Sequence, residues 1–268
     1  MASHKNNSIL GPAAPEIGWV PTPRYLMRRA RILRMLDKLP TGRLLEVGPG
    51  AGALVIEASL RGFQCEALEV SGAARGLSEA MITRAARKIP VHGSPNSGWD
   101  ECFDVLFAFE VLEHIEDDRI ALAQWRSWLK PGGHLLLSVP AHKQLWTAGD
   151  EWAGHIRRYE RRSLLRLLDY VGFEVDEFEC YGFPLTNFSE RVGAPIYARQ
   201  ISARKLATQN DRQRNNDLSG IDRRSHLKYY PLLSSILGRL ALRVCLVIQG
   251  VFVRSDFGTG YLVKARRV

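Results

Sequence analysis

Cysteine is scarce in this chain of 268 residues: there are four, with no C-x-x-C pair and no histidine at zinc-ligand spacing. Such scattered cysteines indicate buried thiols in a reducing compartment, so we expect neither disulfides nor a metal site. No run of about 20 apolar residues is free of charge, and the N-terminus lacks the apolar core of a secretory signal. These absences favour a cytoplasmic protein without a membrane-spanning helix.

Acidic residues are in deficit, because 28 Asp and Glu stand against 37 Lys and Arg, a formal net charge of +9. A basic balance suits an anionic substrate, a membrane surface or nucleic acid. The sequence has no aromatic-rich basic strand of the kind that binds single-stranded nucleic acid. A nucleic-acid-binding or nucleic-acid-modifying protein is therefore the less favoured alternative.

The most informative stretch is Leu44–Ala53, in which an apolar run containing Glu46 leads into three glycines at alternate positions, Gly48, Gly50 and Gly52. A helical pattern follows, which predicts a strand, a tight turn and a helix start, where backbone approaches a ligand closely. The spacing also fits a dinucleotide fingerprint. However, Pro49 removes an N–H donor that a pyrophosphate would use, and the charge of Glu46 would repel it.

A second acid, Glu69, ends the next apolar segment, twenty-one residues after Gly48. At a separation of about 20 residues, an acid reaches the ribose hydroxyls in this kind of fold. S-adenosylmethionine has a sulfonium, an ammonium and a ribose but no phosphate, so it suits both Glu46 and Glu69. The sequence therefore favours this cofactor over a nicotinamide dinucleotide.

Two later stretches complete a family pattern: Phe103-Asp-Val-Leu-Phe-Ala-Phe-Glu-Val-Leu-Glu-His-Ile115 and Leu129-Lys-Pro-Gly-Gly-His-Leu-Leu-Leu-Ser138. With the glycine-rich turn, they resemble the class I, Rossmann-like S-adenosylmethionine-dependent methyltransferases of the small-molecule type. The resemblance covers residues 23–181 and the last strand. It implies an α/β fold with a doubly wound, mostly parallel seven-stranded sheet whose last strand, Gly260–Ala265, is antiparallel. Base-amine methyltransferases carry an Asn/Asp-Pro-Pro-Tyr/Phe tetrapeptide where this chain has Phe109-Glu-Val-Leu112.

The resemblance also implies which residues contact the cofactor. A leading helix over residues 23–39 would close over the cofactor, with Tyr25, Arg28 or Arg29 at its methionine carboxylate. The family commonly has an acid for the adenine amino group, and here Ser94, Asn96 or backbone would replace it. The full expected set is Tyr25, Glu46, Gly48, Gly50, Gly52, Glu69, Ser94 and Glu110.

Residues 140–159 begin at a strand's carboxyl end, where such folds place substrate chemistry, and lack strong periodicity. His155 is the expected base, because imidazole titrates near neutral pH. Guanidinium groups suit carboxylate and phosphate, so we expect a small anionic or amphiphilic acceptor, methylated on O, N or C. A non-catalytic regulator that binds the cofactor is an alternative. The residues expected to bind the acceptor are His114, Trp146, Asp150, Arg157, Arg158 and Tyr159.

The expected divisions are a flexible arm over 1–22, a methyltransferase domain over 23–189, a basic segment with an apolar helix over 190–253, and the last strand within 254–268. Arg239 and Arg243 interrupt the apolar stretch Leu232–Phe252 one helical turn apart. This stretch is either a core helix or a peripheral contact with the inner face of a membrane. The sequence does not indicate the oligomeric state.

Overall fold

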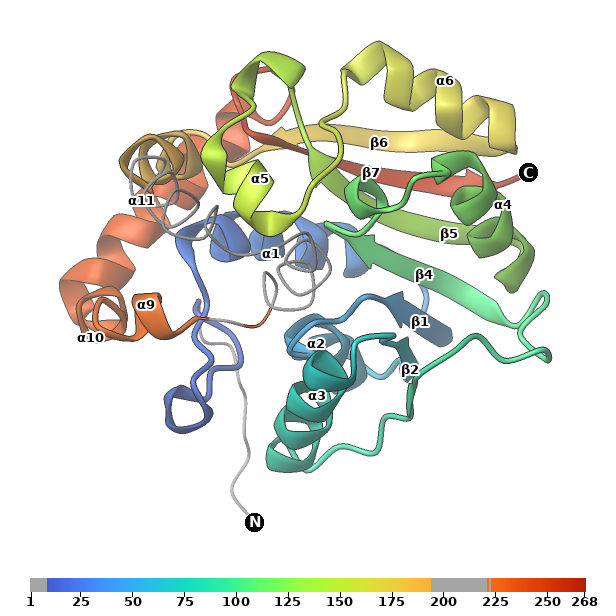
Figure 1. The fold of residues 1–268 in the computed structure, drawn as a ribbon, viewed down its shortest axis with the longest axis horizontal. Helices are drawn as coiled ribbons and strands as arrows, with labels where there is room; N and C mark the ends of the chain where they lie inside the picture. Colours follow the sequence, from blue (N-terminus) through green and yellow to red (C-terminus); the bar gives the residue numbers. More distant parts are fainter. Residues whose placement is uncertain (1–8, 194–220, 222) are drawn as a thin grey trace, which may run out of the picture.

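The computed structural model describes residues 9–193, 221 and 223–268 (Figure 1). Seven strands form one sheet in the order β3-β2-β1-β4-β5-β7-β6, in which β7 alone runs antiparallel to its neighbours. The expected doubly wound sheet with an antiparallel last strand is therefore confirmed. The strands are β1 (Arg43–Val47), β2 (Gln64–Leu68), β3 (Val91–His92), β4 (Phe103–Phe109), β5 (Leu129–Pro140), β6 (Phe173–Tyr181) and β7 (Gly260–Arg267).

Helices cover both faces of the sheet, because its central strands are apolar on both faces (Figure 1). Leu44 of β1 packs into one core with helices α1, α2 and α3, whereas Leu45 packs into the other core with α4 and α6. Consecutive strand residues point to opposite faces, so one apolar run serves both cores. The helices are α1 (Pro23–Leu36), α2 (Ala53–Leu60), α3 (Gly72–Arg84), α4 (Asp118–Trp128) and α6 (Arg161–Val171).

Residues 9–22 pack on the domain, so the expectation of a loose arm is wrong for this part of the arm. Leu10 and Trp19 are buried, and the Trp19 ring meets Tyr25 of α1 edge-on at a centroid distance of 5.5 Å. The only regular element here is a short 3-10 helix, Pro15–Ile17. The segment is attached to the domain by single apolar side chains. Because these residues do not recur at helical or strand spacing, the sequence has no periodic pattern that would indicate their burial.

The apolar stretch near the C-terminus forms two helices, α10 (Tyr230–Ser234) and α11 (Ile236–Phe252), where one was expected. The Ser235 side chain accepts a hydrogen bond from the Gly238 backbone and caps α11. The inner face of α11 is anchored through Gln249, whose side chain bonds the backbone of Met27 and of Gly182. Within the described part of the chain, no helix has both the length and the apolar character needed to span a membrane.

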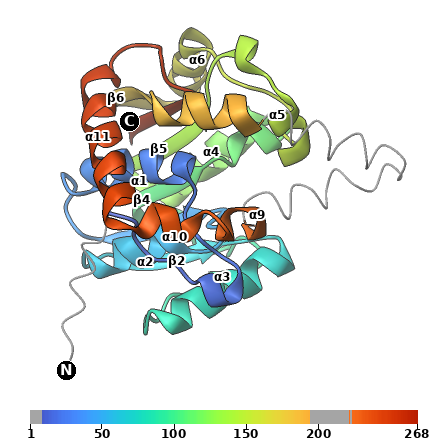
Figure 2. The same ribbon diagram turned by 90° about the vertical axis from the view of Figure 1, so that its left-hand side faces the viewer.

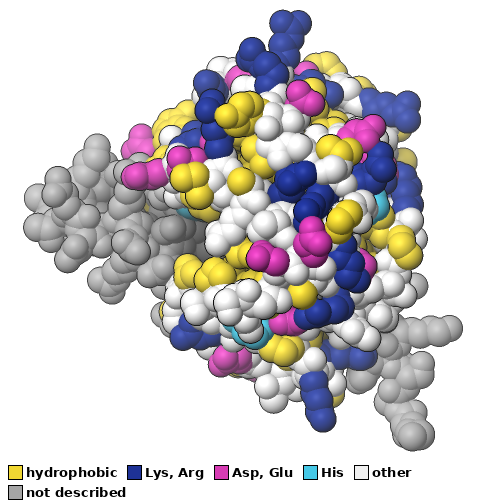
Figure 3. All heavy atoms as spheres, turned by 90° about the vertical axis from the view of Figure 1, so that its right-hand side faces the viewer, with side chains coloured by type: hydrophobic (Ala, Val, Ile, Leu, Met, Phe, Trp, Pro, Cys, Tyr) yellow, Lys and Arg dark blue, Asp and Glu magenta, His cyan; other side chains and the backbone are white. Residues whose placement is uncertain are grey.

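Figure 2 shows α9 (Arg224–Leu227), α10 and α11 on the outside of the molecule, and Figure 3 shows the opposite side. On that opposite side, Lys and Arg are interspersed with acidic and apolar side chains. The positive charge of the face in Figure 3 is therefore spread out and does not form a continuous basic stripe.

Candidate active site

The glycine-rich turn between β1 and α2 carries the backbone to the carboxyl edge of the sheet. Gly48, Gly50 and Gly52 have φ values of +65°, +57° and +73°, which glycine adopts without strain. A Cβ on Gly48 would lie 2.5 Å from the side chain of Val111, so close packing also requires glycine there. The turn thus leaves open backbone for a ligand, as the sequence predicts.

Two cavities meet at this turn, and both are lined by Gly48, Gly50, Glu110 and His114. The larger, of about 520 Å³, extends past Glu69 at the end of β2. The smaller, of about 270 Å³, lies beside α1 and the segment that contains α5 (Ala148–Ala153). A ligand that spans both cavities would have one end near Glu69 and the other near α1.

Glu69 lines the larger cavity. Its carboxylate accepts hydrogen bonds from the backbone N–H groups of Gly50, at 3.3 Å, and Ser71, at 3.0 Å. These bonds fix the carboxylate where a ribose could meet it. Ser94 lines neither cavity, whereas the adjacent Pro95 does, so the structure does not bring the Ser94 side chain to the expected adenine contact.

Glu46 supplies a buried carboxyl group at the smaller cavity. Burial raises its pKa to about 8, although the Arg28 guanidinium opposes this rise. Among the described residues, Glu46 Oε2 and the Tyr25 hydroxyl have no hydrogen-bond partner. Unpartnered buried polar groups of this kind call for a ligand, and the sulfonium and ammonium of S-adenosylmethionine suit a buried carboxyl group. The residues therefore fit the cofactor.

Glu110, which directly follows β4, is already engaged within the protein. Its carboxylate lies 2.7 Å from Arg24 and 3.4 Å from Arg28, and it accepts a hydrogen bond from Tyr181. Burial alone would raise its pKa, but the two arginines outweigh burial and lower the pKa below its usual range. We interpret Glu110 mainly as the anchor that joins α1 to the sheet beside both cavities.

Asp150 organises the segment that follows β5. The Arg158 guanidinium forms two hydrogen bonds to its carboxylate, at 2.8 and 2.9 Å, and Nδ1 of His155 lies 2.9 Å from Asp150 Oδ1. Burial opposes ionisation, but these partners lower the pKa of Asp150 below its usual range. Asp150 and Arg158 are both buried, so Arg158 fixes Asp150 and is not free to grip an acceptor.

Asp150 and Arg158 line the smaller cavity. In contrast, three other residues that were expected at the acceptor site line neither cavity: Trp146, Arg157 and Tyr159. Arg157 lies 2.7 Å from Asp118 and donates to the backbone of Glu116, while the buried Tyr159 hydroxyl donates to Asp118 at 3.0 Å. Trp146 is partly exposed outside the cavities. Arg157 and Tyr159 tie the segment to the start of α4 and do not reach into the site.

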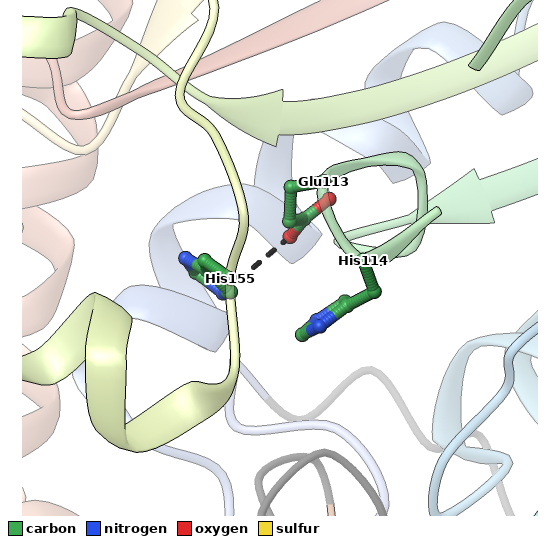
Figure 4. A group of neighbouring side chains, drawn as sticks. All are labelled: Glu113, His114 and His155. Carbon is green, nitrogen blue, oxygen red and sulfur yellow. Dashed lines mark ion pairs between the residues drawn. The ribbon is translucent and has the colours of Figure 1, made fainter. Parts of the chain in front are cut away.

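His114, Trp152 and His155 line the smaller cavity. Glu113 lies close to His155 (Figure 4). The His114 and His155 rings meet edge-on at 4.9 Å, and His155 Nε2 lies 3.7 Å from Glu113 Oε1. Burial lowers the pKa of His114 to about 4, and burial raises the pKa of Glu113. Glu113 and Trp152 are not among the residues expected to bind the acceptor, although the signal for Glu113 is the Glu-His pair shortly after β4.

Residues 23–177 match the sequence model of a family described as a methyltransferase domain. A ubiquinone biosynthesis O-methyltransferase of Alkalilimnicola ehrlichii is 30% identical over 118 residues, 42% of this chain and 47% of that protein. The chain thus spans about half the length of this curated relative.

Two solved structures share the fold at low identity. A putative methyltransferase of Bacillus halodurans has a TM-score of 0.56 and 15% identity, with 89% of this chain and 98% of that chain covered. A phosphoethanolamine N-methyltransferase of Haemonchus contortus, in complex with S-adenosylmethionine, has a TM-score of 0.53 and 17% identity, with 90% and 52% covered. The family match covers more than half of the sequence, and the chain belongs to the class I, S-adenosylmethionine-dependent methyltransferases.

Proposed function

We propose that the protein transfers a methyl group from S-adenosylmethionine to a small molecule bound beside His155. The observation that carries the proposal is that His155 and the glycine-rich turn line the same cavity. When bound, S-adenosylmethionine supplies an electrophilic methyl group. The protein then has to position the acceptor, exclude water and remove a proton where the acceptor carries one.

His155 is the residue that we assign to activation of the acceptor. Because Nδ1 is held by Asp150, Nε2 is left facing Glu113 and the cavity. An imidazole fixed in this way is oriented to accept a proton from an acceptor hydroxyl or amine. The indole rings of Trp19 and Trp152 line the same cavity and would exclude water from it.

Arg28 and Tyr25 are the groups best placed for the carboxylate of the cofactor. Both line the smaller cavity, and among the described residues the Nε of Arg28 and the hydroxyl of Tyr25 lack hydrogen-bond partners. A guanidinium and a hydroxyl both donate to a carboxylate. Both residues are among those that the family resemblance implies for the methionine carboxylate.

Substitution of His155 tests this assignment. In His155→Ala, the rate of S-adenosylhomocysteine release should fall about 10²–10⁴-fold, the usual contribution of a general acid or base. The affinity for S-adenosylmethionine should stay within about twofold, because cofactor contacts are assigned elsewhere. His134→Ala, on β5 and outside both cavities, is the matched control. Equal losses of cofactor affinity and turnover would show that His155 belongs to the cofactor site.

We infer further that the acceptor is amphiphilic and is reached from an anionic membrane surface. The outer face of α11 exposes apolar side chains at spacings of four, four, three and four residues, and Figure 2 shows this helix on the outside of the molecule. Residues 223–255 contain six Lys and Arg and no acid. Each basic residue near an anionic surface contributes about 1 kcal/mol. The exposed apolar residues are Ile236, Leu240, Val244, Val247 and Val251.

Flotation on vesicles with anionic lipid tests this contact. The protein should float with the vesicles at low salt, and less of it at high salt, because salt screens the basic residues. Leu240→Glu with Val247→Glu should abolish flotation. Tyr170→Glu on α6 adds one negative charge on the other side of the sheet and should leave flotation unchanged. If the wild-type protein stays unbound at low salt, the membrane contact is refuted, whereas methyl transfer is unaffected.

A further inference from the structure

Three side chains with metal-binding atoms meet at the acceptor end of the smaller cavity. Glu113 and His114 belong to the short helix η2 (Leu112–His114) that follows β4, and His155 comes from the loop after α5 (Figure 4). One ligand atom from each lies within 4.8 Å of the other two. Ligand atoms on one tetrahedral ion lie about 3.4 Å apart at metal–ligand distances of about 2.1 Å. The 3.7 Å between Glu113 and His155 is already close to that value.

In the part of the chain that the structure describes, the carboxyl group of Glu113 is buried without the hydrogen bonds that normally stabilise such a group. Its side chain is fully buried, and neither carboxylate oxygen has a hydrogen-bond partner among the residues that the structure describes. The nearby Arg24 and Arg28 pair with Glu110, and they offset the effect of burial on Glu113 only in part, because its pKa is still raised. Burying a carboxylate whose charge is only partly compensated is costly, and buried charges in proteins are generally paired or coordinate a metal. A cation between Glu113 and the two imidazoles would compensate it.

Both imidazole rings are held in a way that suits coordination. The Nδ1 of His155 is fixed by the buried Asp150, so its Nε2 can present a lone pair. This carboxylate–histidine arrangement is the one that orients metal-binding histidines, and Arg158 holds the carboxylate in place. The Nδ1 of His114 has no hydrogen-bond partner within the described chain, while the ring bonds the backbone of Gly154.

We propose that Glu113, His114 and His155 bind one divalent transition-metal ion. Two imidazole nitrogens and one carboxylate oxygen favour ions such as Zn²⁺, Co²⁺ or Mn²⁺ over Mg²⁺ and Ca²⁺, which prefer oxygen ligands. Three protein ligands leave a coordination position open toward the cavity. This position would take an oxygen of the acceptor, a step that rests on the proposed function. With the ion bound, His155 Nε2 is a ligand and cannot accept a proton, so His155 would then orient the acceptor through the ion; the role of base proposed above belongs to the protein without the ion.

Cobalt binding tests the site without an activity assay. The full chain is treated with a chelator, dialysed and titrated with Co²⁺, and the ligand-field absorption and the bound metal are measured. We expect one ion per chain, displaced by Zn²⁺ but not by a similar concentration of Mg²⁺. Glu113→Gln and His155→Gln should each weaken binding at least about a hundredfold, and Asp150→Asn about 10–100-fold. The control His92→Gln should bind as the wild type does.

A second measurement avoids dependence on the variants' folding. The chain has seven histidines, and Zn²⁺ should shift the ring resonances of two of them in the wild-type protein. Absence of a stoichiometric ion, or binding that survives both Glu113→Gln and His155→Gln, overturns the proposal. Calorimetry with S-adenosylhomocysteine is run on the same chelated sample. If S-adenosylhomocysteine binds but no ion does, only the metal site fails; if it does not bind, the proposed function fails.

Discussion

Glu46 allows the cofactor site to be tested by a single substitution. Its carboxyl group is buried, and its pKa is raised from 4.5 to about 8, first by burial and then by the charge of Glu69. Arg28 and a backbone hydrogen bond from Val55 oppose this rise. The Tyr25 hydroxyl and the Cys65 thiol, which also interact with Glu46, stay neutral because burial raises the pKa of each. Glu46→Gln removes the ionisation and keeps the shape.

The direction in which cofactor affinity changes with pH follows from the protonated and ionised states of Glu46. At pH 7, a group with a pKa of about 8 is ionised in roughly one molecule in ten. A bound cationic ligand favours the ionised form, so binding of S-adenosylmethionine should release nearly one proton. Its affinity should rise about tenfold for each pH unit between 6 and 7 and level off above pH 8.

The free energy of unfolding of the free protein should change with pH in the opposite direction to the affinity for the cofactor. Unfolded Glu46 ionises near pH 4.5, whereas the folded group stays protonated up to pH 8. The unfolded state therefore binds fewer protons between these values, and stability falls as pH rises through this window. The loss due to Glu46 is on the order of 5 kcal/mol once pH exceeds 8, and it should be absent in Glu46→Gln.

Calorimetric titration in two buffers with different ionisation heats measures the released protons. We expect close to one proton per ligand for the wild type at pH 7 and none for Glu46→Gln, with weaker binding in the variant at pH 8. Glu79→Gln, an exposed position on α3, is the control. Equal proton release in the wild type and in Glu46→Gln would refute the reasoning.

Two further substitutions test the cofactor contact and the position of α11. Glu69→Ala should weaken S-adenosylmethionine binding about ten- to a hundredfold, because hydrogen bonds to a charged group contribute roughly 1.5–3 kcal/mol. Calorimetry measures this loss of affinity, with Ser94→Ala as the control. Unchanged affinity in a folded Glu69→Ala variant would show that Glu69 does not contact the cofactor. Leu242→Ala should lower the free energy of unfolding by about 2–5 kcal/mol, because Leu242 is buried against the domain. Ile236→Ala, which alters the outer face of the same helix, should change the free energy of unfolding by less than about 0.5 kcal/mol in urea denaturation. Similar losses for the two variants would mean that α11 does not dock through Leu242.

The cofactor side of the site could be predicted because its signals are local. Glu46 at the end of β1 and the glycines Gly48 and Gly50 in the turn after it lie close together in the sequence. The need for glycine in this turn is a property of the backbone. The strands were recognised for a similar reason, since each is a short apolar run bounded by turn residues. The spacing from Gly48 to Glu69 then follows from one strand–helix–strand unit.

The acceptor side could not be read in the same way, because its contacts join distant parts of the chain. Nothing local shows that Arg158 pairs with Asp150 or that Arg157 reaches Asp118, and an Arg-rich loop suits anion binding equally well. The cluster of His155 with Glu113 depends on how that loop folds over the end of β4. A search for cysteine and histidine at fixed spacing cannot find such a cluster.

Transfer of label from methyl-labelled S-adenosylmethionine tests the central claim most directly. The protein is incubated with the labelled cofactor and a small-molecule and lipid extract of the source organism, and the products are separated. We predict that label enters a small molecule, with an equal amount of S-adenosylhomocysteine formed, and that Glu69→Ala slows the transfer at low cofactor concentration. Label that stays in the cofactor, or that enters only nucleic acid or protein, would contradict the account.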